Sequence, residues 1–263
     1  MGDFIFPVLI AIVVGGFSWG RWYGPLLTVT PLASPRRVRT PLYLVPIFCF
    51  TVVFLVLLFL ASPDVRNDTS YIIAYLCLSI GWLGGATLVF PLLGVSARDD
   101  VIERNNHSAL WTLAGALISV TLCFAGANIG SGPGPEVVFF CAILATCSLF
   151  FQWFILEAIS APSDAITVER DENAGIRLAG FLVGTGLLLG GAVAGDWASA
   201  HQTLLDFCFR AWPSIVLLAI AAILERVYRR RTEPAGQCDR GTFGIASLYI
   251  LSSAVWVVAR GWQ

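Results

Sequence analysis

The chain has 263 residues, of which 57% are hydrophobic and 13% are charged, and its formal net charge is −1. A soluble domain usually carries about 25% charged residues, so this chain has too few charged side chains to cover a surface exposed to water. These values, with a mean hydropathy of +0.79, exclude an ordinary soluble domain and indicate an integral membrane protein.

Apolar runs long enough to cross the roughly 30 Å hydrocarbon core of a bilayer recur along the chain. In chain order they lie near residues 4–20, 42–61, 71–94, 108–129, 136–160, 174–195, 207–227 and 242–259. The first run is short and Pro213 interrupts the seventh, so seven spans are an alternative to eight. We expect one polytopic domain over residues 1–263, all-α, with about eight transmembrane helices arranged as helical hairpins.

The arginines are distributed unevenly between the two predicted membrane faces. Thirteen of the 16 basic residues, all of them arginine, lie in or beside the loops 21–41, 95–107, 161–173 and 225–241. The other three, Arg66, Arg210 and Arg260, lie at the opposite face. Basic loops favour the cytoplasmic side, so we predict a multi-pass protein of the inner (plasma) membrane with both termini outside.

Two segments of the chain share a pattern. The first reads, in chain order, Glu103-Arg104, Ser108-Ala109 and Leu113-Ala114-Gly115. The second reads Glu169-Arg170, Asn173-Ala174 and Leu178-Ala179-Gly180. From Ser108 and Asn173 onward the offset is 65 residues. The pattern predicts an internal repeat with units of about 71–129 and 136–195, which is parallel because each unit contains two helices.

These residues resemble a bacterial inner-membrane family called domain of unknown function 350. That family has a four-helix unit with an Asn-x-Ala-x-Ala…Leu-Ala-Gly motif opening its second and fourth helices. The matching residues are Asn106, Ala109 and Leu113-Ala114-Gly115 in one copy, Asn173, Ala174 and Leu178-Ala179-Gly180 in the other, and Gln152 at the family's mid-helix glutamine. The chain departs from the motif before the asparagines, where Asn105 and Glu172 replace a glycine. The resemblance covers about residues 71–195 and implies an inner-membrane protein with no settled activity, sometimes encoded near membrane-stress or ATP-grasp proteins.

Polar side chains near the predicted helix ends are the candidate functional positions: Gln152, Glu157, Arg177, Asn106 and Asn173. Ser108 and Asn173 begin helices, so each is expected to be an N-cap, with an entry site for a cation or lipid headgroup as the alternative. Glu157 and Arg177 lie about one turn from the cytoplasmic ends of adjacent helices. We predict that they pair, because an unpaired charge at that depth costs about 2.5–3.5 kcal/mol; a gate or proton-handling site is the alternative.

Gln152 lies about eight residues from the cytoplasmic end of its helix, or ~12 Å deep at 1.5 Å per residue. Its amide needs a partner, either on another helix or in a polar passage. The helix over residues 174–195 is rich in glycine at small-xxx-small spacing, which permits close packing within the chain or between copies in a homo-oligomer.

The sequence contains no pattern that indicates catalysis. Without lysine it cannot form the Schiff base of retinal or pyridoxal phosphate or complete a P-loop. It shows no nucleophile–base pair and no metal-ligand set, and no ionisable residue lies at a predicted midplane. We therefore expect no catalytic, cofactor-binding or metal-binding residues and no nucleic-acid partner. The favoured function is a non-enzymatic membrane scaffold that docks a cytoplasmic protein through the mixed-charge loops near 98–100 and 169–172. The alternative is an oligomeric channel or passive conduit for ions or small solutes.

Overall fold

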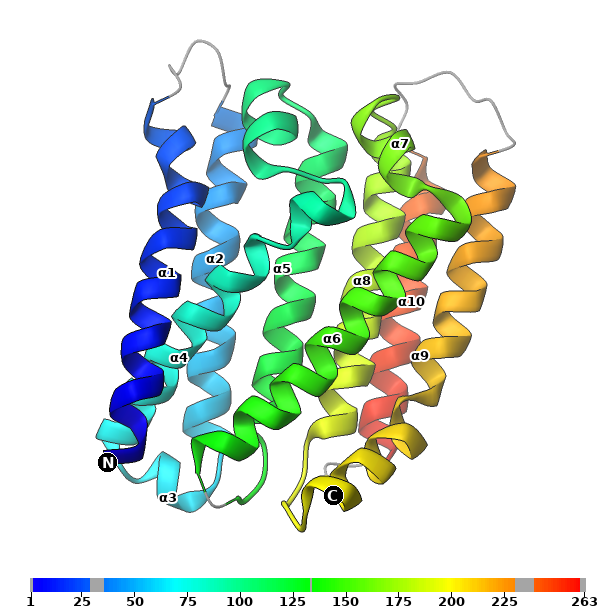
Figure 1. The fold of residues 1–263 in the computed structure, drawn as a ribbon. Coiled ribbons are helices and arrows are strands. Elements are labelled where there is room, and N and C mark those ends of the chain that lie inside the picture. Colours follow the sequence, from blue (N-terminus) through cyan, green and yellow to red (C-terminus); the bar gives the residue numbers. More distant parts are fainter. Residues whose placement is uncertain (1, 29–35, 133, 230–238, 261–263) are drawn as a thin grey trace.

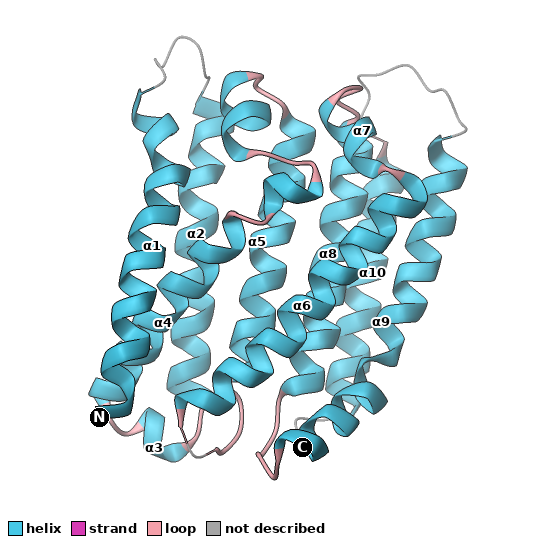
Figure 2. Ribbon diagram, viewed as in Figure 1, coloured by secondary structure: helices cyan, strands magenta, loops and turns pink. Residues whose placement is uncertain are grey.

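The computed structural model describes residues 2–28, 36–132, 134–229 and 239–260. Every element in these ranges is a helix, and the described connections are short (Figure 2). The elements are α1 (Gly2–Thr28), α2 (Arg36–Phe59), α3 (Pro63–Arg66), α4 (Thr69–Thr87), η1 (Phe90–Leu93), η2 (Ala97–Glu103), α5 (His107–Ala127), α6 (Pro135–Ser160), α7 (Pro162–Thr167), α8 (Glu172–Val193), α9 (Ala200–Arg229) and α10 (Arg240–Arg260).

Among the described residues, eight helices are long and apolar enough to cross a membrane. This agrees with the predicted number, and Pro213 lies inside the continuous helix α9 rather than ending a span. The first span is longer than predicted, since α1 continues to Thr28. The structure therefore confirms an all-helical chain with eight candidate membrane spans.

The long helices form a row crossed by oblique neighbours (Figure 1). Helices α2, α5, α8 and α10 run in one direction, and each packs on the next one in the row. Helices α1, α4, α6 and α9 run the other way, and α4 and α6 cross the row obliquely. η2 and α7 lie at one end of the molecule, which we call the arginine-rich end; both chain termini lie at the opposite end. Arg230 and Arg231, and the side chains of Arg36 and Arg37, lie outside the described residues.

Small residues allow the row to pack closely. A Cβ atom added to Gly115 in α5 would lie 2.5 Å from the Cα atom of Ala179 in α8. A Cβ atom added to Gly180 in α8 would lie 2.6 Å from the Cα atom of Ala246 in α10. Both distances are too short for any larger residue, so glycine is required where these backbones meet. The glycines of α8 thus contact α5 and α10 within one chain, while the predicted contact between copies through this helix stays a prediction.

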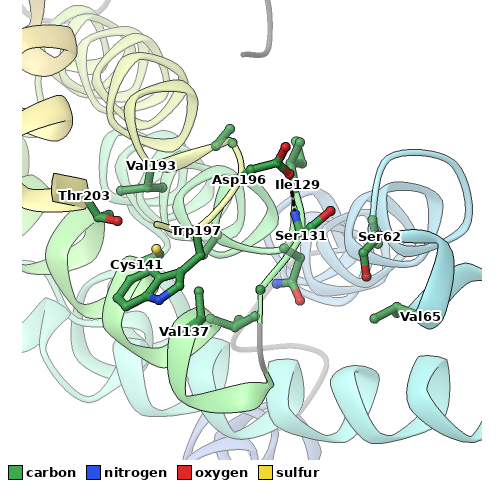
Figure 3. A pocket seen from close by; sticks show the side chains of 18 of the residues that line it. Ser62, Val65, Ile129, Ser131, Val137, Cys141, Val193, Asp196, Trp197 and Thr203 are labelled. Atoms are coloured by element: carbon green, nitrogen blue, oxygen red, sulfur yellow. Dashed lines mark hydrogen bonds between the residues drawn. The ribbon is translucent and has the colours of Figure 1, made fainter. Parts of the chain in front are cut away.

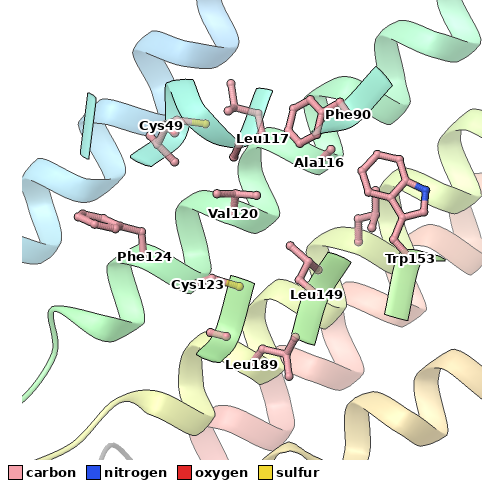
Figure 4. Packing of buried hydrophobic residues seen from close by; sticks show 14 of the residues in the cluster. Cys49, Phe90, Ala116, Leu117, Val120, Cys123, Phe124, Leu149, Trp153 and Leu189 are labelled. Atoms are coloured by element: carbon pink, nitrogen blue, oxygen red, sulfur yellow. The ribbon is translucent and has the colours of Figure 1, made fainter. Parts of the chain in front are cut away.

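The apolar core fills the space between the row and the oblique helices (Figure 4). Phe90 and Trp153 are almost fully buried, with their ring centroids 6.0 Å apart. Leu117 and Leu149 are buried beside them. This packing joins η1 and α6 to α5 through van der Waals contacts.

The helix caps lie two residues earlier than predicted. Asn106, not Ser108, is the N-cap of α5, and its side chain accepts a hydrogen bond from the Ser108 backbone N–H at 3.0 Å. Asp171, not Asn173, is the N-cap of α8 and accepts from the Asn173 N–H at 3.0 Å. The prediction was wrong because Asn106 and Asp171 are themselves good N-cap residues and precede the positions that we chose.

Ser108 and Asn173, which do not cap their own helices, link successive helices of the row. The Ser108 hydroxyl donates to the Asp171 carbonyl oxygen at 2.5 Å, which joins α5 to the start of α8. The Asn173 side-chain oxygen accepts from the Asp239 backbone N–H at 2.9 Å, which joins α8 to the start of α10. The starts of α5, α8 and α10 are therefore bonded together in series.

Candidate functional site

A buried ion pair joins α8 to α9 near the arginine-rich end. The Arg177 Nε and Nη2 atoms donate to Glu225 Oε1 at 2.7 Å and to Oε2 at 2.9 Å. The two side chains are only 4% and 9% exposed. This fork-to-fork geometry is the strongest form of an Arg–carboxylate contact.

Two further groups stabilise the Arg177 guanidinium. The Tyr228 ring lies beside it, with the Arg177 Cζ atom 4.6 Å from the ring centroid. The Asp171 carboxylate, part of the α8 cap, is 4.0 Å from Arg177 Nη2. The arginine therefore contacts two carboxylates and one aromatic face, which satisfies a charge that is otherwise costly at membrane depth.

The predicted pair between Glu157 and Arg177 is wrong. Glu157 accepts hydrogen bonds from the Ser163 backbone N–H at 3.2 Å and from the Ser163 hydroxyl at 2.5 Å. Arg177 points instead toward Glu225 on α9. Glu157 and Glu225 each lie about one turn from the same end of their helices, so depth alone does not distinguish them. The pairing depends on which face of its helix each acid occupies.

Gln152 is buried in α6 and bonds to another helix, as one of its two predicted roles requires. Its Nε2 atom donates to the Ser214 hydroxyl of α9 at 2.8 Å. Ser214 follows Pro213 and donates in turn to the Ala211 carbonyl oxygen. The Gln152 Oε1 atom has no hydrogen-bond partner among the described residues, and neither does the Thr185 hydroxyl of α8.

The arginine-rich end contains two folded connections, η2 and α7, in place of simple linkers. The Asn106 Nδ2 atom donates to the Ile166 carbonyl oxygen at 2.7 Å, so α7 is tied to the N-cap of α5. The Trp111 indole N–H donates to Glu172 at 3.0 Å, which is a second bond between the starts of α5 and α8. Asn106 and Asn173, both named from the sequence, thus act in the hydrogen bonds between helix starts.

The opposite end has a small polar pocket between the ends of α5 and α8 (Figure 3). Its volume is about 80 Å³. The Asp196 carboxylate accepts from the Ser131 N–H at 2.8 Å, and the Trp197 N–H donates to the Ser131 carbonyl oxygen at 2.8 Å. These bonds hold the two segments that wall the pocket. A pocket of this size has room for only a few water molecules.

Several partners were missed by sequence reasoning. Glu225 was not considered as a partner of Arg177, although it lies inside the predicted span 207–227. An acid one turn from the end of an apolar helix is a signal for a buried pair. Ser214 gave no signal, since a serine inside an apolar run usually bonds to its own helix. In the part of the chain that the structure describes, no three His, Cys, Asp or Glu side chains lie close enough to hold a metal ion.

In comparisons with known proteins, no family model, no curated protein and no solved structure matches the chain. The class that the fold defines is a polytopic helical membrane protein. Its particular activity has to be argued from the polar groups described above.

Proposed function

We propose that the chain is a non-enzymatic scaffold of the bacterial inner membrane that docks a partner protein on its arginine-rich end. The observation that carries this proposal is the hydrogen bond from Asn106 to Ile166 at 2.7 Å, which fixes α7 against the start of α5. A loop that only joins two spans does not need such a bond. A rigid surface, by contrast, lowers the ordering cost of binding a partner.

The side chains exposed at this end suit protein recognition. Val168 is 75% exposed, although it is apolar. Arg98 and Glu103 form a pair at 3.0 Å with side chains that are 67% and 47% exposed. Arg229 and Asp164 form a second exposed pair at 3.3 Å. Exposed pairs of this kind contribute little to stability, so they can exchange partners at an interface at low cost.

The distribution of arginine supports a cytoplasmic position for this end. Thirteen of the 16 basic residues lie in or beside its loops, as the positive-inside rule requires of cytoplasmic loops. The docked partner is then a cytoplasmic protein, and both termini lie outside the cell.

We also propose that the fold contains an internal parallel repeat, with units of about 71–129 and 136–195. Features 65 residues apart support it. Asn105 and Arg170 are non-glycine residues with φ of 53° and 57°, and each directly precedes a helix cap. Equivalent backbone bonds close the two turns, at 3.1 Å and 2.9 Å, from Asn106 to Asp100 and from Asp171 to Ala165. The relation to the family called domain of unknown function 350 remains a proposal over the same residues.

The docking proposal is tested by a photoreactive amino acid at Val168. We expect irradiation of intact membranes to yield a discrete protein adduct. Reversal of exposed charges at the same end of the molecule (Arg98→Glu with Glu103→Arg, and Glu169→Arg) should reduce its yield several-fold, because complementary charge favours the right partner.

Two controls accompany that experiment. Arg66→Glu reverses a charge at the opposite end and should leave the yield unchanged. The same photoreactive residue at Phe209, which is 74% exposed on α9, should give lipid adducts. The absence of any protein adduct at Val168, or an equal yield after charge reversal, would contradict docking through this end.

One observation favours a second candidate, the oligomeric channel or passive conduit. The Gln152 Oε1 atom is buried without a partner among the described residues. A buried carbonyl oxygen without a hydrogen-bond donor can accept a hydrogen bond from water or coordinate a cation. Ion flux through reconstituted protein separates the candidates, because a scaffold conducts no ions.

A further inference from the structure

A groove on the side of the helix bundle is lined by α1, α4 and α6. Its volume is about 610 Å³, within the range of about 300–1,000 Å³ that ligand pockets occupy. Val14 of α1, Gly85 of α4 and Phe150 of α6 are among the residues that line it. Phe6 and Ile10, which also line it, are exposed. The groove therefore opens on the outer surface of the bundle, which acyl chains cover in a membrane.

The groove is almost wholly apolar. Apart from Thr146 and Cys147, its lining residues have hydrocarbon or aromatic side chains or are glycine. The Thr146 hydroxyl already accepts a hydrogen bond from the Trp82 indole N–H, at 3.3 Å. A ligand that must form hydrogen bonds would lose them here, so the groove suits a hydrocarbon chain.

A second cavity, of about 310 Å³, lies farther along α1 toward the arginine-rich end. Ile10 and Val14 line the groove, while Phe17 and Arg21 line the second cavity. Their spacings of four, three and four residues place all four side chains on one face of α1. The groove and the second cavity therefore follow the same face of this helix.

The length of this face matches one leaflet of a bilayer. Arg21 follows Ile10 by eleven residues, which is ~16 Å along a helix at 1.5 Å per residue. This is about half of the roughly 30 Å hydrocarbon core. A lipid with its headgroup at Arg21 would therefore extend its acyl chains along the groove to the depth of Ile10.

The second cavity is positively charged. Arg21 and Arg98 line it, and none of the described residues that line it is acidic. The Cζ atom of Arg21 lies 5.9 Å from the Phe17 ring centroid, and Arg21 forms no hydrogen bond or ion pair within the described ranges. Arg98 donates to Glu103 through its Nε atom at 3.0 Å. Arg21 is therefore the guanidinium with all of its donors available to an anion.

We propose that the groove and the second cavity together bind one anionic phospholipid of the leaflet next to the arginine-rich end. Arg21 donates to the phosphate, for which a guanidinium has matching bidentate geometry, and one acyl chain lies in the groove. This site goes beyond the proposed docking function. Its test variants, at Arg21 and Cys147, lie outside η2 and α7, so either proposal can fail alone.

Native mass spectrometry of the purified full chain tests the headgroup contact, with phosphatidylglycerol and phosphatidylcholine as separate probes. We expect a retained phosphatidylglycerol adduct and little phosphatidylcholine. Arg21→Gln should weaken the adduct about tenfold, the loss expected when a hydrogen bond to a charged group is removed. Arg21→Lys should fall between wild type and Arg21→Gln, since lysine keeps the charge but loses the fork. Arg66→Gln, at the opposite end, is the matched control and should retain the lipid.

Equal retention of the two lipids by the wild-type protein would overturn the site, because an ordinary lipid contact does not select by charge. Equal phosphatidylglycerol retention in wild type and Arg21→Gln would also overturn it, as would an equal loss in Arg66→Gln. Arg21 is exposed, so Arg21→Gln should fold, and thermal melting verifies this.

A second pair of variants tests the groove. Cys147 and Cys208 are both exposed, but only Cys147 lines the groove. Cys147→Trp should fill part of the groove and weaken phosphatidylglycerol retention several-fold, while Cys208→Trp should leave it unchanged. Glycerophosphoglycerol, which has the headgroup but no acyl chains, should not be retained. Equal behaviour of the two tryptophan variants, or retention of glycerophosphoglycerol as strong as that of the lipid, would overturn the assignment of the groove to an acyl chain.

Discussion

At the scale of single residues, Arg177 illustrates how a charge is accommodated inside an apolar chain. Its guanidinium is bound by both oxygens of Glu225, at 2.7 Å and 2.9 Å, and by the face of Tyr228. The sequence predicted that Arg177 pairs with an acid from a neighbouring helix, because an unpaired charge is costly when removed from water. Arg177 does bind such an acid. The sequence predicted the wrong acid. A sequence indicates how deep a residue lies along a helix, but packing between helices decides which side chains face each other.

Removing one member of this pair should destabilise the protein strongly. Glu225→Gln removes the carboxylate that binds the buried Arg177 most closely and leaves only Asp171, at 4.0 Å, which costs about 3 kcal/mol. We expect a lower midpoint of thermal unfolding for Glu225→Gln in detergent. Glu157→Gln, the matched change at the acid that the sequence favoured, should have a much smaller effect, because the hydrogen bonds of Glu157 within the described ranges go to Ser163, six residues along the chain.

The paired replacement separates charge from packing. Arg177→Met combined with Glu225→Leu removes both charges, and such apolar replacements of buried pairs are often neutral. The double variant should therefore be more stable than Glu225→Gln alone. If Glu225→Gln melted like wild type, the pair would not be a stabilising contact.

At the scale of helices, the row α5–α8–α10 depends on small residues. The sequence predicted close packing from the glycine spacing of residues 174–195, and α8 contacts α5 and α10 through these glycines. The N-caps were predicted two residues late, because a run of polar residues precedes each of these helices and local sequence alone does not choose among them. Each cap directly follows a left-handed residue, Asn105 or Arg170. Asparagine is enriched in this conformation but arginine is not, so the sequence does not indicate the turn in both places.

Adding a methyl group to this interface should destabilise the fold. In Gly115→Ala, the new Cβ atom would lie 2.5 Å from the Ala179 Cα atom, and the overpacking should cost about 1–3 kcal/mol. Gly16→Ala in α1 is the control, since no heavy atom lies within 4 Å of its added Cβ. Alanine favours a helix over glycine by up to about 1 kcal/mol, so the control should keep or raise the melting temperature. An equal response of the two variants would contradict the packing account.

At the scale of the whole molecule, the helices form a close-packed body with its polar groups satisfied mainly at the ends. The number and order of the spans were readable from the sequence, because length and apolar content decide them. The row of four parallel helices could not be predicted from the sequence, because hydropathy carries no information on which spans are neighbours.

This architecture supports a scaffold more strongly than a conduit. Gln152, the one deep amide that was expected to line a passage, is 7% exposed and bonded to Ser214. The Arg177–Glu225 pair is likewise enclosed between helices. We therefore propose a protein that spans the membrane without conducting ions.

The most direct test is monovalent ion flux into proteoliposomes that contain wild-type protein or Gln152→Leu. Both preparations should be shown to be folded and uniformly oriented before comparison. The scaffold account predicts flux equal to that of protein-free vesicles in both cases. Flux through the wild-type protein that Gln152→Leu changes would contradict the account and assign the chain to the conduits.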